Sequence, residues 1–346
     1  MSFKLWTAGL FAALALTTGC IIQEADGDEE GGAGGQGNQG GSGMGGGPIG
    51  EQGSRLFVVN VNMGVSSYAE PAQQDGRIEP ATTLVSGADT DMYGPRDLAI
   101  APNGDLYVAA ENGGAVVVYA NGLTADGAVL PTRKLEGAAT GLSEPISIAF
   151  DGDSDTLYAV NSGSTDAADL TIFAYESAST ADGDVAPTRG IEVDFEGFSP
   201  LQIAWHKGTL YAVTQDYNTC RVLVFEDAST LSGAIVPTRM IENADFGQIM
   251  SIYVDDSGLY AVDEETDLFV YAPEAATPSA KIEIAGALKL SAVTFDAVGT
   301  MFLADSSANF IYSFDGGAGA EATQSPSRAF DAIGLSLPAR LAVVEP

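Results

Sequence analysis

The chain of 346 residues is long for one hydrophobic core, unless that core is divided among repeats. Its 47 acidic residues against 14 basic ones give a formal charge of −33, which excludes nucleic acids and anionic lipid headgroups as charge-driven partners. Hydrophobic residues make up 45% of the chain, so most of it is able to fold.

The first twenty residues have the pattern of an export signal. Lys4 is their only charged residue, and the apolar run over residues 5–16 is too short to span a bilayer. The run ends in LTTGC, which resembles the lipobox of bacterial lipoproteins. This resemblance implies a signal peptide over residues 1–19, cleavage after Gly19 and lipid attachment at Cys20. The alternative is a secretory signal in which the cysteine is incidental.

Lipid attachment would place the protein in the bacterial cell envelope, at the outer membrane or the cell surface, because several acyl chains anchor a protein stably. Residues 20–53 are acidic and then glycine-rich, with no apolar face, so we expect a flexible tether. Apart from Cys20, Cys220 is the only cysteine, and the exported chain therefore has no intramolecular disulfide. Residues 54–346 are expected to form the folded domain.

A short phrase of the type LYAV recurs along this domain. Its first residues, spaced 42 to 53 residues apart, are Leu56, Leu106, Leu157, Leu210, Leu259 and Met301. A repeat near fifty residues indicates a repeat architecture. In each unit an alternating run such as DLAIAP or SIAFDG precedes the phrase, and another such as AVVVYA or RVLVFE follows it. Alternation of Val, Ile, Tyr and Phe between turn residues predicts strands.

A second phrase closes each unit and is best preserved as VLPTRKLEG, VAPTRGIEV and IVPTRMIEN. Proline donates no hydrogen bond to a ladder, so we expect this phrase to begin the outermost strand of each unit. Its Arg and Glu are then expected on an exposed rim, although a repeated ligand site along that rim is the alternative. Four strands in each of six units predict an all-β fold, a six-bladed β-propeller.

The first unit begins at Arg55 and lacks the run that precedes the phrase. The chain ends in LPARLAVVEP, so we expect the strand from Arg340 to Val344 to complete this first blade and close the ring. The segment PTRKLEGAATGLSEPISIAFD, residues 131–151, resembles the repeats of NHL-type six-bladed propellers. The resemblance covers residues 55–346 and implies the fold, but little about function.

One polar residue of each blade follows the LYAV phrase and is expected near one mouth of the central channel. These residues are Asn60, Glu111, Asn161, Asp216, Asp263 and Asp305. Similar six-bladed hydrolases and lactonases bind calcium there through Glu, Asn and Asp, which implies a calcium site for the last five. The alternative is that the side chains cap turns.

The segment DGDSDT offers another candidate calcium site, because Asp151, Asp153 and Asp155 stand at alternate positions, as at the start of a calcium loop. An acidic hairpin turn is the alternative. His206, the only histidine, is expected in a surface turn without a nucleophile. Trp205 is expected between blades, and Cys220 is expected to be structural.

The signal, tether and repeats together favour a surface-anchored, non-enzymatic, monomeric propeller that acts as a binding scaffold for a protein or a glycan. The alternative is a calcium-dependent hydrolase or lactonase at an acidic mouth of the central channel. The two hypotheses differ in what they require at this mouth. The enzyme needs three or more ring carboxylates or amides within reach of one metal ion and a pocket above them, whereas a scaffold needs neither.

Overall fold

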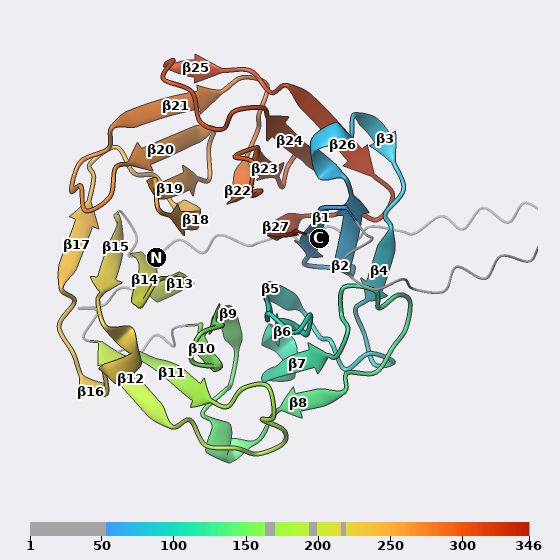
Figure 1. Cartoon of the computed structure of the whole chain (residues 1–346), viewed down its shortest axis with the longest axis vertical. Helices are drawn as coiled ribbons and strands as arrows, with labels where there is room; N and C mark the ends of the chain where they lie inside the picture. The colour runs from blue at the N-terminus through green and yellow to red at the C-terminus, as the bar shows by residue number, and fades with distance from the viewer. Residues whose placement is uncertain (1–52, 163–169, 194–198, 216–218, 346) are drawn as a thin grey trace, which may run out of the picture. The chain divides into compact units, whose positions relative to one another are not determined.

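The computed structural model describes residues 53–162, 170–193, 199–215 and 219–345. The predicted signal peptide, Cys20 and all of the tether except Gly53 lie outside this range. The described residues form six sheets arranged in a ring around a central axis, as Figure 1 shows. The prediction of an all-β, six-bladed propeller is confirmed. None of the described helices is long and apolar enough to cross a bilayer.

Each blade is an antiparallel sheet of four strands. From the innermost strand to the outermost, blade 1 consists of β27 (Pro338–Val344), β1 (Arg55–Asn60), β2 (Gly64–Ala69) and β4 (Thr82–Val85). Blade 2 consists of β5 (Pro95–Ile100), β6 (Leu106–Ala110), β7 (Ala115–Tyr119) and β8 (Arg133–Leu135). Blade 3 consists of β9 (Pro145–Asp151), β10 (Thr156–Asn161), β11 (Leu170–Glu176) and β12 (Arg189–Val193).

The other three blades follow the same order. Blade 4 consists of β13 (Ser199–His206), β14 (Thr209–Gln215), β15 (Cys220–Phe225) and β17 (Arg239–Glu242). Blade 5 consists of β18 (Ile249–Asp255), β19 (Gly258–Asp263), β20 (Asp267–Tyr271) and β21 (Ala280–Ile284). Blade 6 consists of β22 (Leu290–Phe295), β23 (Met301–Asp305), β24 (Phe310–Phe314) and β26 (Arg328–Ala332). Within the described residues, single-turn 3-10 helices lie at Pro71–Gln73, Glu111–Gly113, Ala138–Thr140 and Ala228–Thr230.

The LYAV phrases form the second strand of each blade, and both faces of this strand are buried. In β10, Leu157 and Ala159 pack into the core shared with blade 2, whereas Tyr158 and Val160 pack into the core shared with blade 4. Successive side chains of a strand point to opposite faces, so a strand covered on both sides needs apolar residues at every position. The core therefore consists of layers between neighbouring blades.

The ring closes through blade 1, to which both halves of the chain contribute. Strand β27 pairs with β1 in antiparallel register, with Val343 opposite Leu56 and Leu341 opposite Val58. In Figure 1 the red β27 lies beside the blue β1. The predicted closure by the strand ending at Val344 is confirmed.

Most outer strands are covered by a short segment of the following blade, which we call a strap. A strap is the segment just before the outer strand of its own blade, and it pairs in parallel with the outer strand of the preceding blade. Straps cover five of the six outer strands, as the pairs Leu84–Gly127, Leu135–Gly183, β12 with β16 (Gly233–Ala234), β21 with β25 (Thr323–Gln324), and β26 with β3 (Gly76–Ile78). Straps therefore tie neighbouring blades together.

The arginines of the PTR phrases also tie blades together. Strands β8 and β12 begin at Arg133 and Arg189, as predicted, but these side chains are only 15% and 14% exposed. Arg133 Nη1 donates to the carbonyl oxygens of Ala178 and Ala181 in the next blade, at 2.8 and 3.2 Å. Placing these arginines on an exposed rim was therefore wrong. The sequence of one unit does not show the carbonyl groups that the next unit offers.

Candidate functional site

All six blades have a β-bulge near the start of the innermost strand, and this bulge determines which residue of the second strand lies opposite that start. In blade 2 it places Ala110, and not Glu111, opposite Pro95. In blade 4 it places Thr214 opposite Pro200. The six equivalent positions are Asn60, Ala110, Asn161, Thr214, Asp263 and Asp305. The equivalent positions thus include an alanine and a threonine, which lack the carboxylate or amide oxygen that a metal site of this kind needs.

The two asparagines of this ring join neighbouring segments of the chain. Asn60 Oδ1 accepts a hydrogen bond from the backbone N–H of Ser336 at 3.1 Å. Asn161 Oδ1 accepts one from the N–H of Ser143 at 3.1 Å, while its Nδ2 donates to the Gly141 carbonyl at 2.9 Å. Both amides therefore hold turns in place, as the structural alternative predicts.

The carboxylates at this mouth are also hydrogen bonded to backbone groups. Asp263 Oδ1 accepts hydrogen bonds from the N–H groups of Glu265 and Asp267, both at 3.1 Å. Asp305 Oδ2 accepts one from the N–H of Leu288 at 2.7 Å. Asp263 thus fixes the connection between the second and third strands of blade 5, and Asp305 holds the segment that leads into the innermost strand of blade 6.

The predicted calcium site is only partly within the described residues. Glu111 forms an ion pair with Arg96, at 2.6 Å from the Arg96 Nε, and Asp216 lies outside the described ranges. Within those ranges, no three His, Cys, Asp or Glu side chains lie together as a metal ion requires. A calcium site formed by the five residues predicted from the sequence stays a prediction.

We expect calcium to leave the melting temperature unchanged, because the described ring carboxylates already accept backbone hydrogen bonds. A resident ion would instead stabilise the fold by about 2.7 kcal/mol at one hundred times its dissociation constant. Calorimetry with added CaCl₂ measures this directly. A calcium-dependent rise that Asp263→Asn removes would contradict our expectation and favour the hydrolase alternative.

The titration of Asp263 provides a test of this local structure. Burial is the main reason why the pKa of Asp263 rises from 3.8 to about 6. Between these values the folded state binds more protons than the unfolded state, so the contribution of Asp263 to stability falls as the pH rises from about 4 to 6. We expect Asp263→Asn to match the parent at pH 4 and to be about 1–2 kcal/mol more stable at pH 7. Urea unfolding at both pH values measures the difference, and an equal offset at both would contradict it.

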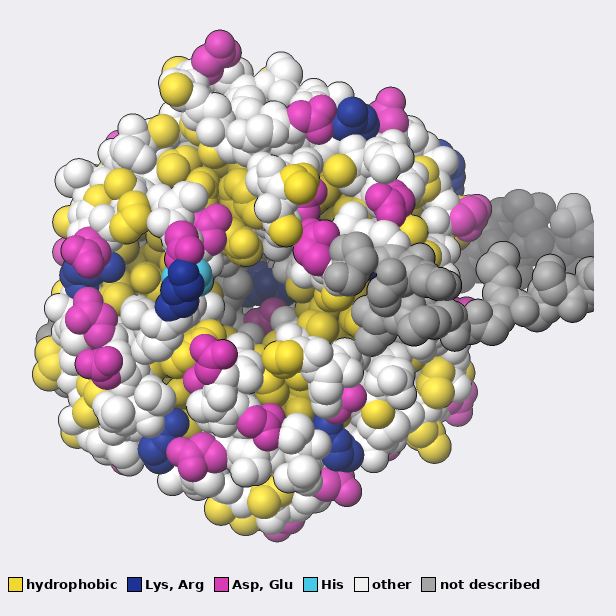
Figure 2. Space-filling model, in the orientation of Figure 1, with side chains coloured by type: hydrophobic (Ala, Val, Ile, Leu, Met, Phe, Trp, Pro, Cys, Tyr) yellow, Lys and Arg dark blue, Asp and Glu magenta, His cyan; other side chains and the backbone are white. Residues whose placement is uncertain are grey.

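The central channel contains a hollow of about 510 Å³, within the usual size range for ligand sites. Its charged lining residues are Arg96, Glu111, Lys289 and Arg340, so the described wall is basic rather than acidic. Figure 2 shows dark blue Lys or Arg side chains inside this central opening. Only 14 basic residues occur in the whole chain, so three of them at one hollow are a local concentration of positive charge.

Arg340 joins the closing strand to three other blades across this hollow. Its Nη1 donates to the Met250 carbonyl at 3.0 Å, its Nη2 donates to the Leu201 carbonyl at 3.3 Å, and its Nε lies 3.8 Å from Asp97 Oδ1. Burial raises the pKa of the Asp97 carboxyl, and the charge of Arg340 opposes this rise. The side chain therefore braces the ring from inside.

The second candidate calcium loop is a hydrogen-bonded hairpin turn. Asp151 Oδ1 accepts from the N–H of Asp153 at 3.0 Å, and Asp151 Oδ2 accepts from the Ser154 hydroxyl. Asp155 Oδ1 accepts from the N–H of Ser179 at 3.0 Å. Asp153 is exposed. These hydrogen bonds describe an acidic turn between two strands, and a calcium loop at these residues stays a prediction.

The remaining candidate residues lie where the sequence indicated. His206 ends the first strand of blade 4 at a surface turn, and its Nε2 lies 3.0 Å from Asp256 Oδ1. Trp205 stacks on Tyr158 between blades 3 and 4, with ring centroids 5.3 Å apart. Cys220 is buried at the start of β15.

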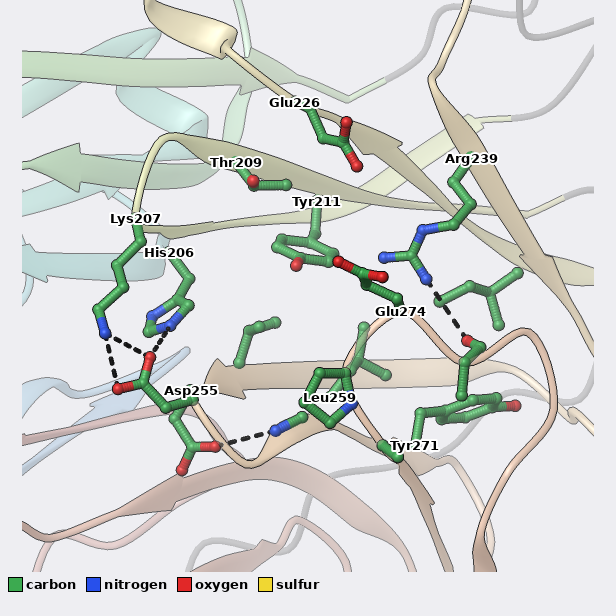
Figure 3. A pocket seen from close by; sticks show the side chains of 17 residues that line it. His206, Lys207, Thr209, Tyr211, Glu226, Arg239, Asp255, Leu259, Tyr271 and Glu274 are labelled. Atoms are coloured by element: carbon green, nitrogen blue, oxygen red, sulfur yellow. Dashed lines mark hydrogen bonds and ion pairs between the residues drawn. The ribbon is translucent and has the colours of Figure 1, made fainter.

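Sequence reasoning missed a pocket at the rim between blades 4 and 5, shown in Figure 3. It has a volume of about 250 Å³, and Tyr211, Arg239 and Glu274 are among its lining residues. In Figure 3 the Arg239 guanidinium points into the pocket toward Glu274. Arg239 Nη1 reaches the Ala275 carbonyl at 3.5 Å, and its Nε is buried without a hydrogen-bond partner among the described residues.

This pocket lies where a strap is missing. Among the described residues, β17 is the one outer strand that no strap covers. Its exposed surface includes Met240, at 42%, and the preceding Val236, at 84%. The sequence does carry a signal for this gap. Repeats 2 and 3 contain TADGAV and TADGDV before the PTR phrase, whereas blade 5, in the repeat of 42 residues, has only APEAATPS there.

Comparisons with known proteins give a fold but no family. No family model matches the sequence, and no curated protein does. A chain in the crystal structure of a nidogen/laminin complex superposes with a TM-score of 0.59 at 13% identity, covering 84% of this chain and 98% of that one. A crystal structure of the computationally designed Ika8 protein matches at 0.44 and 15% identity, covering 84% of this chain and 76% of that one. The sequence repeats, the strand order and the closed ring together identify the chain as a six-bladed β-propeller.

Proposed function

We propose that this protein is a lipid-anchored binding scaffold of the bacterial cell envelope, and that a partner protein docks at the open rim of blade 4. The lipobox-like sequence before Cys20 and the glycine-rich tether support anchoring and display. The propeller in the nidogen/laminin complex is an example of this fold in a complex between proteins.

The uncovered edge of β17 is the observation that carries this proposal. Natural proteins protect the edges of their sheets, because unpaired backbone groups recruit other strands. Among the described strands, every other outer edge is covered by a strap, whereas β17 lies beside a pocket and exposed apolar side chains. An edge left open in a ring that covers the other five favours a binding role for blade 4.

The test is site-specific photocrosslinking in the native envelope. A photoreactive residue at Met240 is expected to give a discrete crosslinked species. The same residue at Lys134, the equivalent position of the strap-covered blade 2, is expected to give none. Equal yields at both positions, or no product at either, would contradict docking at blade 4.

The anchor is tested separately through Cys20. We expect Cys20→Ser to move the protein from the membrane fraction to the soluble fraction, because the acyl chains are lost. Retention of this variant in membranes, with no incorporation of labelled fatty acid into the parent protein, would contradict the anchor. Neither outcome bears on the docking test.

A further inference from the structure

We propose that β17 binds an extended segment of the partner as a short parallel strand, and that this segment carries an apolar residue followed by Asp-Gly. The inference rests on the proposed function and specifies the chemistry of the same site. It follows from what the straps of this chain do at the equivalent edges.

The aspartate of a strap holds a backbone N–H of the edge that it covers. Asp182 Oδ1 accepts a hydrogen bond from the N–H of Lys134 at 3.0 Å, and Asp126 Oδ1 accepts one from the N–H of Thr83 at 2.7 Å. The same contact recurs at blade 6, where Asp75 Oδ1 accepts a hydrogen bond from the N–H of Ala329 at 3.3 Å. Three straps thus satisfy the edge through the same side chain.

The glycine that follows each of these aspartates completes the pairing. Gly183 N–H donates to the Lys134 carbonyl at 2.8 Å, and the Gly183 carbonyl accepts from the N–H of Glu136 at 3.2 Å. In the same way, the Gly127 N–H donates to the Thr83 carbonyl at 2.7 Å. Gly127 and Gly183 both have φ of +76°, a conformation that favours glycine over other residues.

The register of the sheets shows which groups of blade 4 correspond to these contacts. Arg133 pairs with Val118 in the third strand of blade 2, and Arg239 pairs with Val224 in the third strand of blade 4. The residue after each arginine is also equivalent, so Lys134 corresponds to Met240. The open groups of β17 are therefore the N–H and carbonyl of Met240 and the N–H of Glu242. Within the described part of the chain, no backbone hydrogen bond from another blade reaches them.

The pocket beside β17 explains the apolar residue. In blades 3 and 4 the residue before the Asp-Gly or Ser-Gly pair is Ala181 or Leu231, which packs against the core between blades. The carbonyls of these residues also accept from Arg133 and Arg189, at 3.2 and 2.9 Å. At blade 4 the pocket lies in this place, and among the described residues Arg239 has one hydrogen-bond acceptor, the Ala275 carbonyl at 3.5 Å.

The occupant that we infer is a different protein rather than a second copy of this chain. Each described strap already pairs with the outer strand of its own ring, so a second copy has none of them free to offer. Added strands gain affinity from backbone hydrogen bonds and specificity from pockets for alternate side chains. The rim of blade 4 offers both.

The direct test uses a strap peptide as the probe. A fluorescent peptide of residues 179–187, STADGDVAP, is titrated against the Cys20→Ser chain at about 150 mM salt, near physiological ionic strength, and read by anisotropy. We expect saturable binding that Met240→Pro weakens at least tenfold, because proline removes the N–H that the aspartate contacts. The control Met240→Ala keeps this N–H and is expected to bind within threefold of the parent.

A second measurement leaves the protein unchanged. Replacing the peptide glycine by N-methylglycine removes the N–H that would pair with the Met240 carbonyl, and we expect at least tenfold weaker binding. Equal affinity for both peptides, or for the parent and Met240→Pro, would overturn the parallel-strand inference. So would dimers of the chain that the peptide does not dissociate. If crosslinking at Met240 persists but the peptide does not bind, the docking surface stands and only this binding mode is wrong.

Discussion

Deletion of residues 340–346 is expected to lower the melting temperature by about 15–40 °C. The deletion removes most of β27 and therefore the innermost strand of blade 1. Leu341 and Val343 leave the core shared with blade 6, and Ala342 and Val344 leave the core shared with blade 2. Losing these apolar contacts costs about 5 kcal/mol, and losing Arg340 costs about 3–5 kcal/mol more. Each kcal/mol corresponds to about 2–4 °C in a domain of this size. Differential scanning calorimetry measures the change.

The matched control removes only residues 345 and 346. Glu345 accepts one exposed hydrogen bond from the N–H of Ala297 at 3.0 Å and belongs to no strand, so we expect a change below about 2 °C. A melt of the longer deletion that coincides with the parent would mean that β27 does not close the ring.

Arg340→Met is expected to destabilise the fold by about 3–5 kcal/mol, the usual cost of breaking a buried charge pair. The substitution leaves the buried Asp97 without its cationic neighbour and leaves the carbonyls of Leu201 and Met250 without their donor. The pKa of Asp97 is already raised by burial, and losing Arg340 raises it further. The variant is therefore destabilised more at pH 7 than at pH 4, where the carboxyl is closer to neutral.

A second substitution separates the lost charge pair from lost packing. Arg340→Met together with Asp97→Asn removes both charges, and we expect it to recover at least half of the lost stability at pH 7. Asp97 accepts from the Leu98 N–H with Oδ1 and from the Ile148 N–H with Oδ2, so the introduced asparagine, which has one side-chain oxygen, keeps one of these two hydrogen bonds. A double variant no more stable than Arg340→Met, with no pH dependence in either, would contradict the pairing.

The number of blades and the closure were predictable because they depend on spacing. The apolar LYAV phrase indicates a strand that is buried on both faces, and the number of its copies, six, gives the number of blades. The missing inner strand before Arg55 and the matching run at Arg340 then identify how the ring closes. These features depend on local alternation, which the sequence displays directly.

The details of the site depend on contacts between repeats, which a single repeat does not display. The fifth position of each phrase, which Ala110 and Thr214 occupy in blades 2 and 4, could be counted from the sequence, but the backbone groups that the ring side chains contact could not. The PTR arginines looked like rim residues because their partner carbonyls belong to the next blade. The straps were visible as a recurring Asp-Gly, but their pairing partners lie about fifty residues away in the preceding unit.

Blade 1 also has a consequence for how the molecule is made. A ribosome or an export channel delivers the chain from its N-terminus, and blades 2 to 6 are complete once residue 332 has emerged. Strand β1 must then wait for β27, about 280 residues later, before its sheet has an inner strand. Until that time the inner edge of β1 is unpaired and the last seam is open. The final assembly step of this protein is therefore timed by the arrival of residues 338–344.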